Sequence, residues 1–403
     1  MSALPAQPQR SLYVVLKVTE RCNLACPYCY FFFAGDDSFK IHPATILGDT
    51  VDGLIRFLLE AIERDGITHV SLGLHGGEPL LLKKAAFDGM CRRFRQALEQ
   101  RCQLSLLVQT NAVLVDQEWV DLFARHRLQV GVSFDGPEAV HNLTRITKKG
   151  RGTYAETRQG WELMQAAARA GRMPAPGILA VVSPQHDARA TYEHFVHELD
   201  CRNINFLLPD FNHDSAEATP EFVAAVGDYM LDICHAWFAD GARHGVEIRF
   251  IKEVMGPLLD DAVCRFNATQ KHNPFALLTV SSNGDIAPDD VIRPLAPRFR
   301  DTGLQVGRES FAHVRGHAAW GELEAAQTTL PSECRSCTWR NACRGGAPQN
   351  RYSAARGFDN PSVYCPALKR IHAYVARNLA LGGLAVEAME ARLEQQYRLA
   401  DAV

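Results

Sequence analysis

The stretch VTERCNLACPYCYFFF, residues 18–33, carries three cysteines, Cys22, Cys26 and Cys29, in the spacing Cys-x3-Cys-x2-Cys. Thiolates are soft ligands that select zinc or iron–sulfur clusters. A structural zinc site needs a fourth ligand, whereas three thiolates leave one iron of a [4Fe–4S] cubane open to bind a small molecule. We therefore predict a [4Fe–4S] cluster on these cysteines. A zinc knuckle or three free thiols is the alternative.

Around this loop, short apolar runs alternate with longer amphipathic runs from about Ser11 to Asn212. The runs LYVVLKV, HVSLGLHG, LSLLVQTN and LQVGVSFDG resemble strands, and further strands are expected at residues 177–183 and 204–208. About six βα units predict an α/β fold with a mostly parallel sheet, closed as a partial (β/α)6 TIM-like barrel. Ligands of such sheets bind at the carboxyl ends of the strands, so motifs that follow the strands should converge.

The pattern changes after Ala216. We expect a helix over about 219–244, a hairpin at LLTVSSNGDIAP with Asn283-Gly284 as its turn, a cysteine-rich loop and a terminal helix pair. These features predict a barrel over residues 11–216, a smaller iron–sulfur domain over 217–370 and a helical extension over 371–403.

The composition is that of an ordinary globular chain of 403 residues, with 47% apolar residues and a net charge of −3. That charge provides no field for gathering nucleic acid. The sequence shows no signal peptide or apolar run of membrane-spanning length, so we expect a cytoplasmic protein without nucleic-acid or membrane partners. Twelve cysteines at clustered spacings favour metal or cluster ligation over a disulfide framework.

Residues 71–80, SLGLHGGEPL, place Gly76, Gly77 and Glu78 after the second expected strand. Glycine has no Cβ, so a ligand can approach the backbone there. Glu78 offers an acceptor for an ammonium group. A plain turn is the alternative.

Polar residues also follow the third and fourth expected strands. QTNAVLV contains Gln109 and Asn111, GVSFDGP contains Ser133 and Asp135, and Arg145 follows within HNLTR. Each has a simpler explanation: Asn111 as a helix cap, Asp135 as part of a turn, and Arg145 as a solvated surface residue.

A second cysteine cluster lies near the C-terminus. Cys334, Cys337 and Cys343 follow the spacing Cys-x2-Cys-x5-Cys, and Cys365 comes after a gap. Four thiolates are enough to close a site, either as a second [4Fe–4S] cluster or as a zinc ribbon. Five further cysteines are expected to be core thiols: Cys91, Cys102, Cys201, Cys234 and Cys264.

The segment at residues 18–33 resembles the signature of the radical S-adenosylmethionine (SAM) superfamily. The resemblance implies that the open iron binds SAM and that Tyr28 lies near the adenine. It also implies that the Gly-Gly-Glu motif meets the methionine amino group. The remaining cofactor contacts that it suggests are Gln109, Asn111, Ser133 and Arg145.

The second cysteine cluster resembles the SPASM domain of radical enzymes that modify peptides. The full SPASM pattern has two more cysteines, at positions that are Asp289 and Ala347 here. We therefore predict one auxiliary [4Fe–4S] cluster, not two. The resemblance implies a precursor peptide as substrate and an external electron donor of the flavodoxin or ferredoxin type.

Within that group, the ERCNLACPYCYFF, LLPDFNHD and NGDIAPDD segments are most similar to maturases that form three-residue cyclophanes, in which an aromatic ring carbon is joined to a β-carbon. Such a reaction needs a base, for which Asp210, Asp214 and Asp289 are candidates and Asp290 is a rival. All of these aspartates have an ordinary alternative as caps or turn residues.

Three other functions stay open. A thioether-forming maturase and an anaerobic sulfatase maturase are the enzymatic alternatives, although Asp289 and Ala347 break the full cysteine set that is typical of sulfatase maturases. An iron–sulfur electron carrier or redox sensor is the non-enzymatic alternative.

Overall fold

The computed structural model describes residues 11–241, 243–269 and 276–396. Its strands form one sheet in the order β7-β6-β5-β4-β3-β2-β1-β8-β9, and every pairing is parallel except β8 with β9. The bounds are β1 Ser11–Thr19, β2 His69–Gly76, β3 Gln103–Thr110, β4 Gln129–Ser133, β5 Gly177–Val181, β6 Asn203–Leu207, β7 Glu247–Ile248, β8 Leu277–Val280 and β9 Ile286–Ala287.

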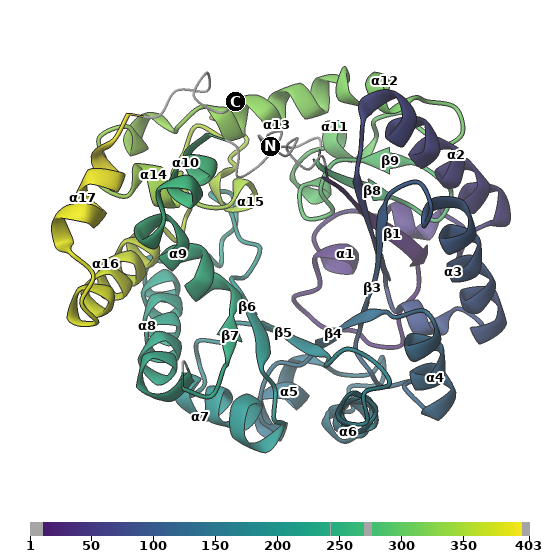
Figure 1. Ribbon diagram of the computed structural model, residues 1–403, viewed down its shortest axis with the longest axis horizontal. Coiled ribbons are helices and arrows are strands. Elements are labelled where there is room, and N and C mark those ends of the chain that lie inside the picture. Colours follow the sequence, from purple (N-terminus) through teal and green to yellow (C-terminus); the bar gives the residue numbers. More distant parts are fainter. Residues whose placement is uncertain (1–10, 242, 270–275, 397–403) are drawn as a thin grey trace, which may run out of the picture.

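The sheet curves into a partial barrel with most helices outside it (Figure 1). The helices are α1 Tyr30–Phe33, α2 Gly48–Asp65, α3 Lys84–Leu98, α4 Gln117–Arg125, α5 Glu138–Thr144, α6 Tyr154–Arg169, α7 Ala188–Glu193, α8 Pro220–Ala236, α9 Arg249–Leu259, α10 Asp261–Thr269, α11 Pro297–Arg300, α12 Phe311–Arg315, α13 Ala318–Thr328, α14 Arg340–Cys343, α15 Pro348–Arg351, α16 Cys365–Leu381 and α17 Val386–Glu394.

Strand β1 lies between β2 and β8 and forms the centre of the core. Its alternate residues Leu12, Val14, Leu16 and Val18 are at most 1% exposed, as expected when successive side chains point to opposite faces of a sheet. The cysteine loop follows β1 directly. The rigid centre of the sheet therefore positions that loop.

The predicted α/β fold with six βα units and a mostly parallel sheet is confirmed by β1 to β6. The predicted hairpin is confirmed as β8 and β9, and Gly284 in its turn has a φ of +94°, a conformation that glycine adopts without strain. The expected long helix ends earlier than predicted, because α8 gives way to a wider π-helical turn at Trp237–Gly241.

The sheet continues past the predicted boundary at residue 216. Strand β7 pairs with β6 and β8 pairs with β1, both in parallel, so the second part of the chain widens the barrel wall. The sheet order ends at β7 and β9, which leaves the barrel open between them among the described strands. The expected division into three domains stays a prediction.

The terminal helix pair is confirmed as α16 and α17. No helix in the described ranges combines the length and the apolar character that crossing a membrane requires.

Candidate functional site

The first cysteine loop is held by backbone hydrogen bonds. Ala25 N–H donates to the Ile146 carbonyl at 2.8 Å and Cys29 N–H donates to Cys26 at 3.0 Å. All three cysteine side chains are half-buried and close enough for mutual electrostatic repulsion. Burial, with that repulsion added, raises the pKa of Cys22 to about 12 and of Cys26 to about 11. The positive charge of a bound metal centre would lower these pKa values and keep the cysteines as thiolates.

The Gly-Gly motif locks this loop against β2. A Cβ on Gly76 would lie 2.0 Å from the Thr19 carbonyl oxygen, and a Cβ on Gly77 would lie 2.2 Å from that of Arg21. The protein's own backbone fills the space that a Cβ would take at both glycines, and approach of a ligand to the backbone there stays a prediction. Gly77 N–H also donates to the Thr19 carbonyl at 2.9 Å.

Glu78 is buried and accepts three hydrogen bonds from the chain. The donors are Leu80 N–H at 3.0 Å, the Thr110 hydroxyl at 2.7 Å and Asn111 N–H at 2.8 Å. Burial raises its pKa to about 6. A carboxylate has about four acceptor sites, so one site is left for a ligand. The contact to an ammonium group therefore stays a prediction.

Asp135 joins two predicted cofactor residues. Its carboxylate accepts hydrogen bonds from the Tyr28 hydroxyl and from Thr144, and it forms an ion pair with Arg145 at 3.0 Å. The Arg145 guanidinium lies 5.6 Å from the centre of the Tyr28 ring. Arg145 is 8% exposed, so the alternative of a solvated surface arginine was wrong. The sequence analysis described Asp135 only as part of a turn. Its place directly after the fourth strand was the signal that could have indicated a contact with Tyr28 and Arg145.

The other predicted cofactor residues form two short contacts. Gln109 Nε2 donates to the Ser133 hydroxyl at 2.8 Å. Asn111 Nδ2 donates to Asn23 Oδ1 at 2.8 Å and lies 4.0 Å from the Cys22 sulfur. Side chains at the ends of β3 and β4 thus contact each other, and a side chain at the end of β3 contacts the cysteine loop. Contact with a cofactor stays a prediction for all of them.

An acidic group lies on the other side of the cysteine loop. Asp290 forms a buried ion pair with Lys17 at 2.7 Å and accepts a hydrogen bond from the Tyr30 hydroxyl at 2.6 Å. Burial alone would raise the pKa of Asp290, but Lys17 and neighbouring cations lower it to about 2. Its charge acts on Cys29 as well. Lys17 and Tyr30 are residues that the sequence reasoning missed.

Asp289 and Asp210 belong to the same group. Burial raises the pKa of Asp289 to about 7, and the charges of Asp290 and Asp210 add to the shift. The Asp210 side chain is exposed to solvent. The surrounding protein still desolvates its carboxyl group and raises its pKa to about 6. These two carboxyl groups titrate near neutral pH, which is the range in which a general base works best.

Asp214 lies apart from this group. It is exposed, and its carboxylate accepts a hydrogen bond from Ala354 N–H at 2.7 Å. Neighbouring His213 is exposed and bonds the Pro361 carbonyl at 2.8 Å. Both side chains hold the loop against the C-terminal region. This contact with a turn amide fits the ordinary structural role that was the alternative for Asp214, and its role as a base stays a prediction.

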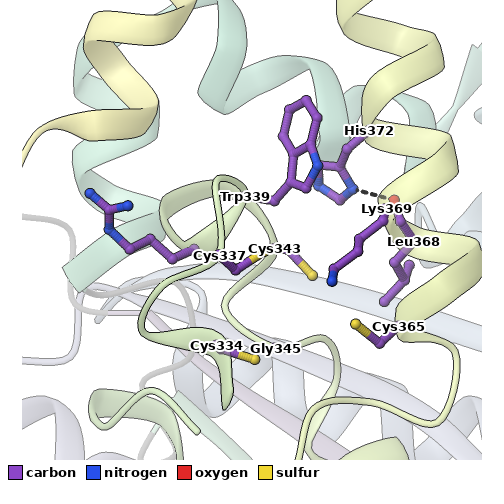
Figure 2. Close-up of a pocket in the computed structure, with 10 residues that line it drawn as sticks. Cys334, Cys337, Trp339, Cys343, Gly345, Cys365, Leu368, Lys369 and His372 are labelled. Atoms are coloured by element: carbon purple, nitrogen blue, oxygen red, sulfur yellow. Dashed lines mark hydrogen bonds between the residues drawn. The ribbon is translucent and has the colours of Figure 1, made fainter. Parts of the chain in front are cut away.

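The second cysteine cluster surrounds a pocket (Figure 2). Cys334, Cys337, Cys343 and Cys365 line it, with Trp339, Lys369 and His372 among their neighbours. Burial and mutual repulsion raise the pKa of Cys334 to about 11 and of Cys343 to about 12. In the described ranges, no three His, Cys, Asp or Glu side chains converge as closely as a single metal ion needs. The four thiols surround a space and do not meet at one point.

The donor set of this pocket suits an iron–sulfur cluster. Four thiolates can hold such a cluster, and Arg340 and Lys369 in the pocket lining supply positive charge. Arg351 lies outside that lining. It is 3% exposed, and its guanidinium donates to backbone carbonyls of Ala326, Phe358 and Asn360.

The cysteines outside the two clusters lie in the core. Cys91, Cys201, Cys234 and Cys264 are buried and Cys102 is half-buried, as predicted. Ala347, at the other position where the full SPASM pattern has a cysteine, directly precedes α15.

Residues 16–173 match the family model described as the radical SAM superfamily. The matched residues contain the second half of β1, the cysteine loop and β2 to β4.

Curated relatives extend the similarity along most of the chain. A "Cysteine-type anaerobic sulfatase-maturating enzyme" of Clostridium perfringens is 24% identical over 88% of this chain and 93% of its own length. A "Serine-type anaerobic sulfatase-maturating enzyme" of Bacteroides thetaiotaomicron is 25% identical over 91% of this chain and 90% of its own.

Solved structures share the fold. "Native anSMEcpe with bound AdoMet" aligns with a TM-score of 0.76 at 21% identity, covering 92% of this chain and 98% of that one. The form with bound AdoMet and Cp18Cys peptide aligns with a TM-score of 0.75 at 20% identity. The partial TIM-like barrel with a C-terminal region is thereby confirmed.

Proposed function

We propose that this protein is a radical SAM maturase that removes a β-hydrogen from a residue of a ribosomally made precursor peptide. In the favoured reaction, the β-carbon then bonds to an aromatic ring carbon and forms a cyclophane. The observation that carries the proposal is an acidic group of Asp289, Asp290 and Asp210, in which Asp290 contacts the Tyr30 hydroxyl directly after the three-cysteine loop.

The cysteine loop would hold the reactive cofactor. When bound there, a [4Fe–4S] cluster supplies an electron to SAM and so yields the 5′-deoxyadenosyl radical. Tyr28, Arg145 and Asp135 form one buried network that fixes the loop on the β4 side. Glu78 accepts hydrogen bonds from Thr110 and Asn111 at the end of β3. It has one acceptor site left for the amino group of SAM.

Asp289 is the proposed base. After hydrogen abstraction, addition of the carbon radical to a ring leaves an intermediate that must lose one proton and one electron to become aromatic again. Asp290 is a poor acceptor for that proton because Lys17 and Tyr30 occupy both of its oxygens. Asp289 is half-buried and titrates near 7. Asp210 is the second proposed acid–base group.

A peptide substrate is supported by the relatives named above, which mature a protein. The same relatives favour a second candidate, oxidation of a cysteine or serine in a sulfatase. Both reactions begin with loss of a β-hydrogen and need a base and an electron acceptor. Asp289 in place of a SPASM cysteine favours the first candidate. An external electron donor and a cytoplasmic location belong to the proposal in both cases.

The test is anaerobic co-expression with each short open reading frame found beside the gene, followed by fragmentation mass spectrometry of the peptides. We expect a loss of two hydrogens that maps between an aromatic side chain and a β-carbon. A carbonyl at a single serine or cysteine of a sulfatase would support the second candidate. A thioether to a cysteine would contradict both.

A further inference from the structure

The loop after β6 carries Asp210 and contacts the C-terminal region of the chain. Residues 208–214 follow the carboxyl end of β6, which is the end of a parallel sheet at which ligands bind. Asp210 is exposed in this loop. Exposed loops are mobile unless other parts of the protein hold them. The groups that hold this loop therefore decide where the Asp210 carboxyl group lies.

Two buried side chains hold the backbone on both sides of Asp210. Asn350, on α15, donates from Nδ2 to the Phe211 carbonyl at 2.8 Å and to the Pro209 carbonyl at 3.3 Å. The Tyr364 hydroxyl donates to the same Pro209 carbonyl at 3.0 Å. Asn350 is 2% exposed and Tyr364 is 0% exposed. Buried donors are costly to leave unpaired, so these hydrogen bonds keep the loop in one position.

Two further contacts join the same segments, which lie side by side (Figure 1). His213 N–H donates to the Tyr352 carbonyl at 3.1 Å. Burial raises the pKa of Asp210 to about 6, and the Gln349 side chain on α15 lowers it. Gln349 therefore acts on the carboxyl group itself, in addition to the hydrogen bonds that fix the backbone.

Both residues that hold the loop belong to the segment that carries the second cysteine cluster. Tyr364 directly precedes Cys365, which is the first residue of α16. Asn350 lies on α15, in the chain between Cys343 and Cys365. The fold of the second cysteine cluster and the position of Asp210 are therefore linked.

We propose that Asn350 and Tyr364 are positioning residues that fix Asp210 at the carboxyl end of the barrel, so that the segment of the second cysteine cluster helps to build the first site. This inference rests on the proposed function, in which Asp210 is the second acid–base group. Such a group acts only within hydrogen-bond reach of the atom with which it exchanges a proton. A misplacement of about 1 Å can cost about 10²-fold in rate.

The test uses the full, reconstituted chain and has two readouts. Tyr364→Phe removes only the hydroxyl group, and Asn350→Asp keeps the shape of the side chain but removes the amide donor. Hydrogen–deuterium exchange of residues 210–214 reports on the loop without any substrate. The ratio of peptide product to 5′-deoxyadenosine reports on the placement of Asp210 during the reaction.

Tyr374→Phe is the matched control. Tyr374 is a half-buried tyrosine on α16 whose ring contacts His235, with 4.5 Å between the ring centroids. Loss of its hydroxyl group should change neither the exchange of residues 210–214 nor the product ratio.

In Tyr364→Phe and Asn350→Asp we expect faster exchange of residues 210–214 and a product ratio that is lower by about tenfold. Formation of 5′-deoxyadenosine and the iron content should stay at the wild-type level. An unchanged product ratio would overturn the inference, because Asn350 and Tyr364 would then have a purely structural role. A ratio that falls only in proportion to lost iron would overturn it as well. If Tyr364→Phe does not fold, Asn350→Asp decides by the same readouts.

Failure of the proposed function would give a different result. A wild-type protein that forms 5′-deoxyadenosine but converts no peptide would contradict the proposed function. The exchange readout then decides the inference alone. Faster exchange of residues 210–214 in Tyr364→Phe would support it, and exchange at the wild-type rate would overturn it.

Discussion

Asp289 has a carboxyl group where the full SPASM pattern has a thiol. A carboxylate oxygen is a hard ligand that suits an iron–sulfur cluster poorly. Burial and two acidic neighbours keep its pKa near 7, so the group can accept a proton at physiological pH. In the proposed function, this one side chain would account for both the absence of a cluster ligand and the presence of a base.

Replacing Asp289 with asparagine should lower peptide product formation by about a hundredfold or more, because general base catalysis contributes about 10²–10⁴-fold. Formation of 5′-deoxyadenosine should continue, since the cysteine loop is intact. In the wild type, product formation should rise between pH 6 and pH 8 as Asp289 ionises. Chromatography of both products across this pH range is the measurement.

Asp232→Asn is the control for this prediction, because Asp232 is an exposed aspartate on α8. It should show the wild-type rate and pH profile. If Asp289→Asn kept the wild-type product rate, Asp289 would not be the base.

Asp290 has a different task, which is to neutralise a buried lysine. Asp290→Asn leaves the Lys17 charge unpaired at 1% exposure, and loss of one partner of a buried pair costs about 3–5 kcal/mol. The depressed pKa of Asp290 adds stability above about pH 4, and this stability is lost as the pH falls toward 2. Urea unfolding at pH 7 measures the cost.

Asp228→Asn is the matched variant for that measurement. Its partner Arg370 is exposed, and exposed pairs contribute about 0–1 kcal/mol. Equal effects of Asp290→Asn and Asp228→Asn would show that the buried pair does not stabilise the site.

At the scale of elements, the cysteine loop is held between the ends of neighbouring strands. The loop after β1 packs against the loop after β2 with no room for a side chain at Gly76 or Gly77. The end of β3 then holds the loop after β2 through Glu78 and the loop after β1 through the hydrogen bond from Asn111 to Asn23. This explains why the glycines, the glutamate and the cysteines occur at the ends of adjacent strands.

Gly77→Ala should therefore displace the cysteine loop and lower the iron content of the first cluster by more than half. The cause is steric, since the new Cβ would meet backbone atoms of Arg21 at 2.2 Å and 2.4 Å. Iron analysis after reconstitution, together with the melting temperature, measures the effect.

Gly89→Ala on α3 is the control, because a Cβ there meets no atom within 4 Å. It should be neutral or slightly stabilising, as alanine is the better helix former. Normal cluster loading in Gly77→Ala would contradict the locking role of the motif.

At the scale of the whole molecule, periodicity predicted the parallel strands, and spacing predicted both cysteine sets. Those features are local in sequence. The extension of the sheet by β7 and β8 was missed because it depends on pairing between residues far apart, such as Tyr13 with Leu277. The Lys17–Asp290 pair was missed for the same reason, since its partners lie far apart in the sequence.

Sequence reasoning could not show which groups of the chain the polar residues after the strands would contact. Glu78 and Asp135 each hold several groups of the chain itself. A sequence shows that a carboxylate follows a strand, but its partners are known only when the loops are placed.

The most direct test of the central claim is anaerobic incubation of the reconstituted protein with dithionite and SAM, with 5′-deoxyadenosine measured by chromatography. We predict that the wild type forms 5′-deoxyadenosine and that Cys26→Ala, which removes one ligand of the first cluster, forms none. Absence of 5′-deoxyadenosine from a wild-type protein with a fully loaded first cluster would contradict the assignment of this chain as a radical SAM enzyme.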